Sequence, residues 1–307
     1  MNRSAPRSID EYLKQLRAAL EGEDPALIQD ALYDAEEYLR AEVAAHPEKS
    51  EADVLELISS TYGAPDEVAT AYRDTEVKVK AALRTPPPRR PENPSGLRRF
   101  FSIYLDPRAY TSLFYMLLTL ATGILYFVLV VVGISMSAGL AVLIIGIPFF
   151  LAFIGITRVI ALGEGRLIEA VTGERMPRRP VHPGAPASWW SRIGAMLSDA
   201  RTWTTLLYFV LMLPLGIIYF LIATVGLSAG VHLALAPLAA LGERFGWLND
   251  DYGFPYPHHL WFSGTGVVSL LLSVLGVFLV TLVMHLARAI GRGHARLAKA
   301  LLVEPGS

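Results

Sequence analysis

Residues 109–157 read AYTSLFYMLLTLATGILYFVLVVVGISMSAGLAVLIIGIPFFLAFIGIT and contain no Asp, Glu, Lys, Arg or His. One transmembrane helix needs about 20 apolar residues. These 49 residues are therefore too long for one span and predict two, joined by a tight turn that we expect near Gly133–Gly139. The stretch indicates a polytopic α-helical membrane protein, because a charged side chain at mid-bilayer costs about 2.5–3.5 kcal/mol.

Two more apolar runs follow in the chain. Thr202–Gly242 is interrupted only by His232, and Leu260–Met284 carries no charge. Residues 229–241 are apolar but too short to cross a bilayer alone, so we expect them either to re-enter the membrane or to lie in its outer interface. The runs together predict four spans, near residues 111–133, 139–161, 204–227 and 262–285.

Basic residues indicate the orientation of these spans. On one side, 16 Lys or Arg residues flank them: five before the first span, seven between the second and third, and four after the fourth. The opposite side has only Arg244. By the positive-inside rule we expect both termini in the cytoplasm. Met1–Arg7 carries no apolar run, so we expect the first span to direct insertion.

Charge is divided unevenly along the 307-residue chain, which is 53% hydrophobic with a mean hydropathy of +0.40. Residues 1–84 hold 18 Asp or Glu against 10 Lys or Arg, a net of −8, and residues 85–307 hold 10 against 17, a net of +7. An acidic head thus precedes a basic membrane part. The chain has no cysteine, which excludes disulfides, thiolate metal sites and cysteine nucleophiles.

Helix signals are dense in the acidic head. Ser8 and Glu11 have the spacing of a capping box. Each predicted helix carries one apolar stripe, so the helices must pack on one another or on a partner. The four helices are predicted to start at Ser8, Asp24, Ser50 and Pro65. Gly63 is predicted to end the third helix.

Three short motifs of the head, Tyr12-Leu13-x-x-Leu16, Asp34–Tyr38 and Tyr62–Ala69, resemble the HAAS domain (HTH-associated α-helical signalling, DUF1700-like) of bacterial membrane proteins. The resemblance implies coupling to PadR-like winged-helix transcription regulators, and it places the chain in a bacterial inner membrane. An ordinary solvated helix face is the simpler interpretation of the acidic residues on the second helix. The alternative is a surface for a basic partner, made by Asp30, Asp34, Glu36 and Glu37.

Residues 85–96 are rich in proline and predict an extended spacer, so we place the domain boundary there. The expected domains are residues 1–84, the linker 85–96 and the membrane domain 97–303. An amphipathic segment precedes the first and the third span, and such segments lie in the membrane interface. Their apolar residues are Leu97, Phe100, Phe101 and Tyr104 in the first, and Trp189, Trp190, Ile193 and Leu197 in the second.

The two hairpins are copies of one another, with repeat 1 at 97–175 and repeat 2 at 190–303. At an offset of 93 residues the matched pairs include Asp106 with Asp199, Arg108 with Arg201, Tyr115 with Tyr208, and Gly123 with Gly216. At an offset of 130 they include Arg158 with Arg288 and Gly163 with Gly293. Both copies enter from the same side, so this is a parallel duplication, unlike the inverted repeats of many transporters.

The motifs Asp106–Tyr110, Gly123-Ile124-x-Tyr126-Phe127 and Gly146-Ile147-Pro148, with Asp199–Trp203 and Leu213–Ile217 in the second copy, resemble the "putative sensor" domain found before bacterial histidine kinase modules. The resemblance covers about residues 97–303. No phosphoacceptor histidine region and no ATP-binding glycine-rich region follow, so we expect output through another protein.

Candidate binding residues fall into two groups. The first group holds the candidate ligand-binding residues at the start of spans one and three together with His232, and a local ion pair or helix cap is the simpler role for its charged residues. The second group holds the Asp and His residues between spans three and four, and an aromatic belt with hydrated polar residues is its simpler interpretation. Histidine in the second group could also report pH. The candidate ligand-binding residues are Asp106, Arg108, Asp199, Arg201 and His232, and the candidate ligands for a divalent cation are Asp250, Asp251, His258 and His259.

No nucleophile–base pair, metalloprotease motif or phosphate loop is present, so we expect neither an enzyme nor a cofactor. The leading hypothesis is a membrane sensor or signalling adaptor whose partners are the lipid bilayer and a winged-helix regulator or another cytoplasmic signalling protein, without direct nucleic-acid binding. A small transporter or lipid-binding channel protein is the first alternative. The second is a scaffold that forms homo-oligomers through its helices.

Overall fold

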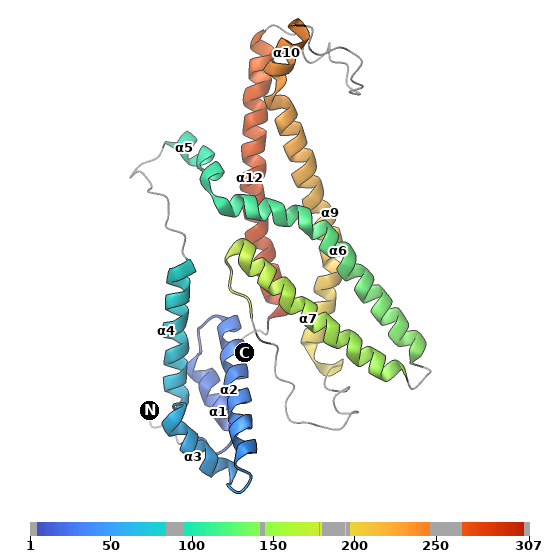
Figure 1. The fold of residues 1–307 in the computed structure, drawn as a ribbon. Coiled ribbons are helices and arrows are strands. Elements are labelled where there is room, and N and C mark those ends of the chain that lie inside the picture. The colour runs from blue at the N-terminus through green and yellow to red at the C-terminus, as the bar shows by residue number, and fades with distance from the viewer. Residues whose placement is uncertain are drawn as a thin grey trace. The chain divides into compact units, whose positions relative to one another are not determined.

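The computed structural model describes residues 5–83, 95–141, 145–177, 179, 194, 197–245 and 266–303. In these ranges every regular element is a helix, and Figure 1 draws them from blue to red along the chain. The predicted all-α class is confirmed.

Helices α1 (Ile9–Ala19), α2 (Pro25–Ala45), α3 (Glu51–Thr61) and α4 (Pro65–Leu83) form the head, and each begins where the sequence predicts. The Ser8 hydroxyl accepts the Glu11 N–H (3.2 Å), and the Asp24 carboxylate accepts the Ala26 N–H (2.9 Å). The Ser50 hydroxyl likewise accepts the N–H of Asp53 (3.3 Å). These caps satisfy donors that the first helical turn leaves free.

One detail of the predicted capping box is wrong. The Glu11 carboxylate accepts the N–H of Arg7 (2.9 Å), one residue before the Ser8 N–H that a capping box uses. The glycine stop is confirmed: Gly63 has φ +107, a value that side-chain-bearing residues rarely adopt.

The apolar stripes of α1 to α4 meet in one buried cluster. Tyr12 and Leu16 of α1 are fully buried in it, and so is Leu20, which directly follows the helix. The Tyr12 hydroxyl donates to the Gly63 carbonyl (2.8 Å) and so ties α1 to the turn between α3 and α4. Burial raises the pKa of Tyr12 well above its usual value, which keeps this hydroxyl a donor.

Four helices of the described residues are long and apolar enough to cross a membrane. Their outward side chains stay apolar: Leu125, Leu221 and Leu271 are each more than half exposed on the isolated chain, as lipid-facing residues would be. The protein is therefore a multi-pass membrane protein. The four helices are α6 (Pro107–Leu140), α7 (Gly146–Thr172), α9 (Ala200–Ala234) and α12 (Gly266–Leu302).

The position predicted for the first turn is wrong. Residues 133–139 are helical, α6 continues to Leu140, and α7 starts at Gly146. Glycine and serine have weak helix propensity, but a backbone without water must form its own hydrogen bonds, so the helix continues through them. Helices α6 and α9 extend beyond their predicted spans at both ends. Helices α7 and α12 begin later than predicted, at Gly146 and Gly266, and continue beyond the predicted ends.

The expectation for residues 229–241 as one separate segment is also wrong. Residues 229–234 complete α9, and a short helix α10 (Ala236–Arg244) follows it. Proline at position 237 falls in the first turn of α10, where its missing N–H costs nothing. Whether this region re-enters the membrane or lies in its interface stays a prediction.

Ahead of α6, the helix α5 (Gly96–Phe101) and the 3-10 helix η1 (Ser102–Leu105) form the first amphipathic segment. Leu97 is 73% exposed, as an interface anchor would be. Residues 85–94 of the linker lie outside the described residues, and so do Trp189, Trp190 and Ile193 of the second amphipathic segment.

The chain divides into two compact units. Unit 1 holds residues 1–91, 136–208 and 296–307, and unit 2 holds residues 92–135 and 209–295. The head therefore belongs to the same unit as α7, the start of α9 and the last turns of α12.

Within unit 2, α6 and α9 approach closely at two glycines. A methyl group on Gly123 would lie 2.5 Å from the Met212 carbonyl oxygen, and one on Gly216 would lie 2.5 Å from the Thr119 carbonyl oxygen. The two contacts are the same contact under the offset of 93 residues, since Thr119 corresponds to Met212. Small residues at such positions allow helix backbones to meet in a membrane.

Helices α9 and α12 run antiparallel in unit 2 and also meet through small residues (Figure 1). A methyl group on Gly230 would clash with Val280, and one on Gly226 would clash with Val283. The Ser273 hydroxyl donates to the Ala234 carbonyl (2.8 Å), at the end of α9 and near the start of α12. The spans of unit 2 are therefore packed backbone to backbone.

Candidate functional site

Asp106 stands at the start of α6 and has two roles. Its carboxylate caps the helix by accepting the Arg108 N–H (3.1 Å), and it forms an ion pair with Arg288 of α12. A helix cap was one of the two simple roles expected for this residue. The charged partner is not the neighbouring Arg108, whose side chain is exposed, but an arginine of the other hairpin.

Asp199 repeats this arrangement in unit 1 at the start of α9. It accepts the Arg201 N–H (3.0 Å) and pairs with Arg158 of α7 (3.0 Å). Arg158 and Arg288 correspond under the offset of 130 residues. Each aspartate therefore pairs with the arginine that the predicted duplication assigns to the other copy.

A second reciprocal arrangement lies inside the helix packing. Tyr115 of α6 bonds to Nε2 of His294 on α12 (2.8 Å), and the hydroxyl of Tyr219 on α9 lies 3.5 Å from Nδ1 of the same ring. His294 and Tyr115 are each only 2% exposed. This cluster belongs to unit 2.

The matched cluster in unit 1 joins Tyr208 of α9 to Glu164 of α7. The Tyr208 hydroxyl donates to a carboxylate oxygen of Glu164 (3.2 Å), and the two residues are 0% and 2% exposed. Glu164 occupies the position in the first copy that His294 occupies in the second, at the offset of 130 residues. A buried carboxylate on a spanning helix is costly, and such residues usually have a function.

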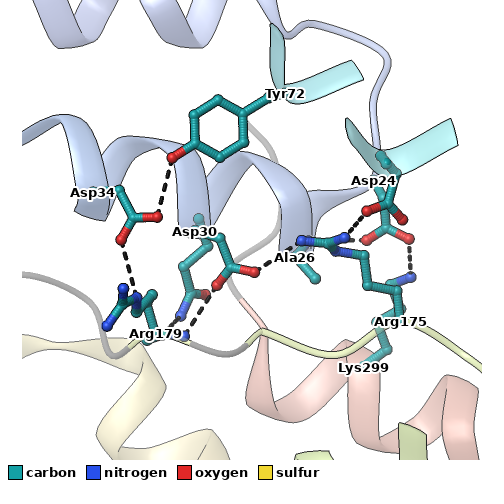
Figure 2. Close-up of polar contacts among 10 residues, drawn as sticks. Asp24, Ala26, Asp30, Asp34, Tyr72, Arg175, Arg179 and Lys299 are labelled. Carbon is teal, nitrogen blue, oxygen red and sulfur yellow. Dashed lines mark hydrogen bonds and ion pairs between the residues drawn. The ribbon is translucent and has the colours of Figure 1, made fainter. Parts of the chain in front are cut away.

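The most extensive polar site joins the head to the segment after α7. Arg175 of that segment pairs with Asp30 of α2 (3.0 Å) and with Glu76 of α4, as Figure 2 shows for Asp30. The side chains of Arg175, Asp30 and Glu76 are 12%, 7% and 8% exposed. One guanidinium thus neutralises two carboxylates that could not remain buried without it.

Arg179 supplies the second half of the site. Its guanidinium pairs with Asp34 (3.0 Å) and lies 5.8 Å from the ring centre of Tyr33. Its main chain is held as well, because the N–H donates to Asp30 (3.0 Å) and the carbonyl accepts from Gln29 (2.7 Å). The Arg179 side chain is half exposed, so its ion pair is weaker than that of Arg175.

Tyr72 of α4 orients the carboxylate that receives Arg179. Its hydroxyl donates to Asp34 (3.0 Å), as Figure 2 shows. Burial, followed by the neighbouring Asp34 carboxylate, raises the pKa of Tyr72 well above its usual value. The hydroxyl therefore stays protonated at neutral pH and remains a donor.

Two further basic residues reach the head from the membrane helices. Lys299 in the last turn of α12 pairs with Asp24 (2.6 Å) and Glu174 (3.4 Å). Arg201 at the start of α9 donates to the Gln29 side chain (3.0 Å) and to the Leu302 carbonyl (3.1 Å). Within unit 1 the head is thus attached to the segment after α7, to the start of α9 and to the last turn of α12. Figure 2 shows the contact of Lys299 with Asp24.

The structure distributes the four acidic candidates of α2 between two roles. Asp30 and Asp34 receive the arginines described above, and Asp30 is only 5% exposed, so the solvated helix face expected for it is wrong. Glu36 pairs with Arg40 one turn away (2.7 Å), and Glu37 is exposed. The burial of Asp30 follows from Arg175, which lies 145 residues further along the chain.

The remaining sequence candidates are placed more simply. His232 is exposed near the end of α9. The proposed metal ligands Asp250, Asp251, His258 and His259 lie outside the described residues, and no group of three metal-ligating side chains occurs within the described ranges.

Several central residues of these sites were not singled out by sequence reasoning. His294 and Glu164 looked like parts of charged segments that follow a span, and Arg175 and Arg179 counted only as orientation signals. One signal was available for the first two, because the offset of 130 residues that pairs Gly163 with Gly293 also pairs Glu164 with His294. Both histidine and carboxylate therefore occupy one repeated position.

Comparison with known proteins agrees with the membrane part of this architecture. No curated protein and no solved structure matches the chain. The family model described as "Putative sensor" matches residues 115–302, which include all four spanning helices except the first turns of α6, and exclude the head. Since the match covers more than half of the chain, the protein belongs to the Putative sensor family.

Proposed function

We propose that this protein is a non-enzymatic membrane sensor that relays a stimulus from the membrane or its outer side to a cytoplasmic partner. The partner we infer is a PadR-like winged-helix transcription regulator, as the resemblance of the head to the HAAS domain implies. The family match supports a sensing role. The protein would lie in a bacterial inner membrane with both termini in the cytoplasm.

One observation carries this proposal: ion pairs connect the head to the ends of spanning helices. The segment after α7 presents Arg175 to Asp30 and Glu76, and the last turn of α12 presents Lys299 to Asp24. Arg175 lies only three residues beyond the end of α7 at Thr172. A tilt or shift of either span therefore moves a residue that the head holds, and it changes the equilibrium between attached and released heads.

The proposed orientation can be tested with thiol labels, since the chain has no cysteine of its own. In the sequence, Ser188→Cys lies between the second and third predicted spans, and Asn249→Cys lies between the third and fourth. In spheroplasts, a membrane-impermeant maleimide should label Asn249→Cys and leave Ser188→Cys unlabelled until the cells are opened. The reverse pattern would contradict the orientation.

The partner can be tested by affinity purification of the full chain from bacterial membranes. We expect the winged-helix regulator encoded nearby to co-purify, and we expect Arg175→Ala, which releases the head, to change the amount recovered. Arg292→Ala, an exposed charge on α12, is the matched control and should change nothing. Failure to recover any regulator with either form, together with substrate flux in proteoliposomes, would favour the transporter alternative instead.

A further inference from the structure

The head binds the segment after α7 as a protein module binds a peptide. Gln29, Asp30, Tyr33 and Asp34 of α2 have the spacing of neighbours on one helix face. We call these four residues, with Glu76 of α4, the arginine face. It contacts both the side chains and the backbone of the segment that lies on it.

The backbone contacts distinguish this face from a cluster of acidic residues. The Arg179 N–H donates to Asp30, and the Arg179 carbonyl accepts from the amide of Gln29. Gln29 and Asp30 are 8% and 5% exposed, so two buried polar side chains contact the backbone of one residue, Arg179. Recognition of a main-chain N–H and carbonyl by fixed side chains is typical of peptide-binding sites.

The side-chain contacts specify two arginines four residues apart. Arg175 enters between Asp30 and Glu76, and Arg179 lies against the ring of Tyr33 with its guanidinium on Asp34. Guanidinium suits both contacts, because it pairs with carboxylates through several N–H groups and packs on aromatic rings.

The fit of the chain's own segment is incomplete. Nε of Arg175 is buried without a hydrogen-bond partner among the described residues. Such a group costs about 1–3 kcal/mol, so this contact is weaker than the face allows. A segment of another protein has to displace the chain's own segment, which is tethered to the head. This displacement requires that the internal contact be weak.

We propose that the arginine face is a binding site for an extended basic segment with two arginines four residues apart, and that Arg175 and Arg179 occupy it in competition with such a segment on the cytoplasmic partner. The inference rests on the proposed function, because it names the surface and the chemistry through which the relay reaches its partner. Attachment of the head and binding of the partner are then mutually exclusive.

The test uses the full chain in lipid nanodiscs and a fluorescent peptide of residues 172–181, with binding followed by anisotropy at one fixed salt concentration. The double variant Arg175→Ala with Arg179→Ala empties the face. It should bind the peptide at least about tenfold more tightly than the wild type, because a tethered competitor acts at roughly millimolar effective concentration. Arg292→Ala with Arg296→Ala removes the same charge from exposed positions and should leave the affinity at the wild-type value.

Two further variants locate the binding. In the emptied background, Asp30→Asn and Glu76→Gln should each weaken binding of the peptide at least tenfold, and a peptide with Arg175 and Arg179 replaced by glutamine should not bind. If the double variant does not fold, Arg179→Ala alone removes only the half-exposed guanidinium and should still bind the peptide about threefold more tightly than the wild type.

Equal affinity in the wild type and the emptied variant would overturn the inference, and so would binding that survives Asp30→Asn and Glu76→Gln. Neither result touches the proposed function, which fails only if no regulator is recovered with the full chain. Conversely, a missing regulator leaves the peptide measurement intact as a test of the face.

Discussion

The two hairpin copies make the same contacts at several matched positions and differ at a few others. Besides the aspartate caps and the glycine contacts, the Tyr110 hydroxyl donates to the Tyr104 carbonyl (3.0 Å), and the matched Trp203 ring donates to the Leu197 carbonyl (2.8 Å). The copies diverge at two matched positions. Glu164 in the first copy corresponds to His294 in the second, and Arg201 in the second copy contacts the head, whereas the corresponding Arg108 is exposed.

This contrast indicates a division of labour within one repeated scaffold. The matched contacts hold helices together, so either copy needs them. The divergent residues are buried ionisable groups or attachments to the head, which a symmetric scaffold alone does not explain. Substitutions at matched positions should therefore give similar effects in the two copies, and at divergent positions the effect should follow the partners that each residue has in its own copy.

The largest effects should come from the buried polar pairs. His294→Ala leaves the Tyr115 hydroxyl buried without this partner and opens a cavity, and Glu164→Ala does the same to Tyr208. Each change should lower the free energy of unfolding in detergent by about 2–4 kcal/mol. The exposed His232→Ala should stay within about 0.5 kcal/mol of the wild type.

A double-mutant cycle separates this pair from simple loss of packing. Combining His294→Ala with Tyr115→Phe should give a coupling energy of at least about 0.5 kcal/mol, and the same holds for Glu164→Ala with Tyr208→Phe. Coupling in only one copy would show that the two pairs are not equivalent in strength.

The glycine contacts of α6 and α9 should come next, and here the copies should agree. Gly123→Ala and Gly216→Ala each place a methyl group against a backbone carbonyl that cannot move away cheaply. Both should cost about 1–3 kcal/mol in the same unfolding measurement. Gly155→Ala and Gly163→Ala meet nothing within 4 Å, and they should be neutral or stabilising by up to about 1 kcal/mol. Unequal losses of unfolding free energy at positions 123 and 216 would show that the two glycine contacts are not equivalent.

The matched arginines 108 and 201 should differ. Arg201→Ala removes hydrogen bonds to Gln29 and to the Leu302 carbonyl, and charged hydrogen bonds contribute about 1.5–3 kcal/mol. Released heads expose Arg175, so trypsin should cut after Arg175 about tenfold faster in Arg201→Ala. Arg108→Ala should leave that rate unchanged. Equal rates in both variants would mean that Arg201 does not hold the head.

Sequence predicts the local features of this molecule well. Ser8, Asp24 and Ser50 cap helices because each lies next to the backbone donors that it satisfies. The spans follow from uncharged runs that are long enough to cross a bilayer. The turn near residue 141 was misplaced because glycine and serine end helices in water, whereas within lipid an unpaired backbone group costs more than weak propensity.

The sites depend on contacts that a sequence does not display. Asp30 looks like any acidic residue on a helix surface, and its burial requires Arg175 from far along the chain. His294 lies in a segment with Arg292 and Arg296, which reads as a solvated basic tail, yet its ring is buried against two tyrosines. Only the internal repeat, which aligns it with Glu164, relates the two positions before the structure is known.

The smallest effects should come from the reciprocal ion pairs. The side chains of Arg158 and Asp199 are 35% and 34% exposed, and those of Arg288 and Asp106 are 38% and 20% exposed. Pairs this open contribute about 0–1 kcal/mol. Arg158→Ala and Arg288→Ala should therefore each shift the unfolding midpoint only slightly, and high salt should reduce the shift.

A charge exchange makes this small effect decisive. Asp106→Arg places two arginines together and should destabilise more than Arg288→Ala does, and adding Arg288→Asp should recover part of the loss. Recovery stays partial because an arginine at position 106 cannot cap α6, whereas Asp106 accepts the Arg108 N–H. The same exchange of Asp199 with Arg158 should follow the same pattern, because that aspartate also caps its helix. If Arg158→Asp instead rescued Asp106→Arg, each aspartate would pair within its own copy, and the exchange of partners between the copies would be wrong.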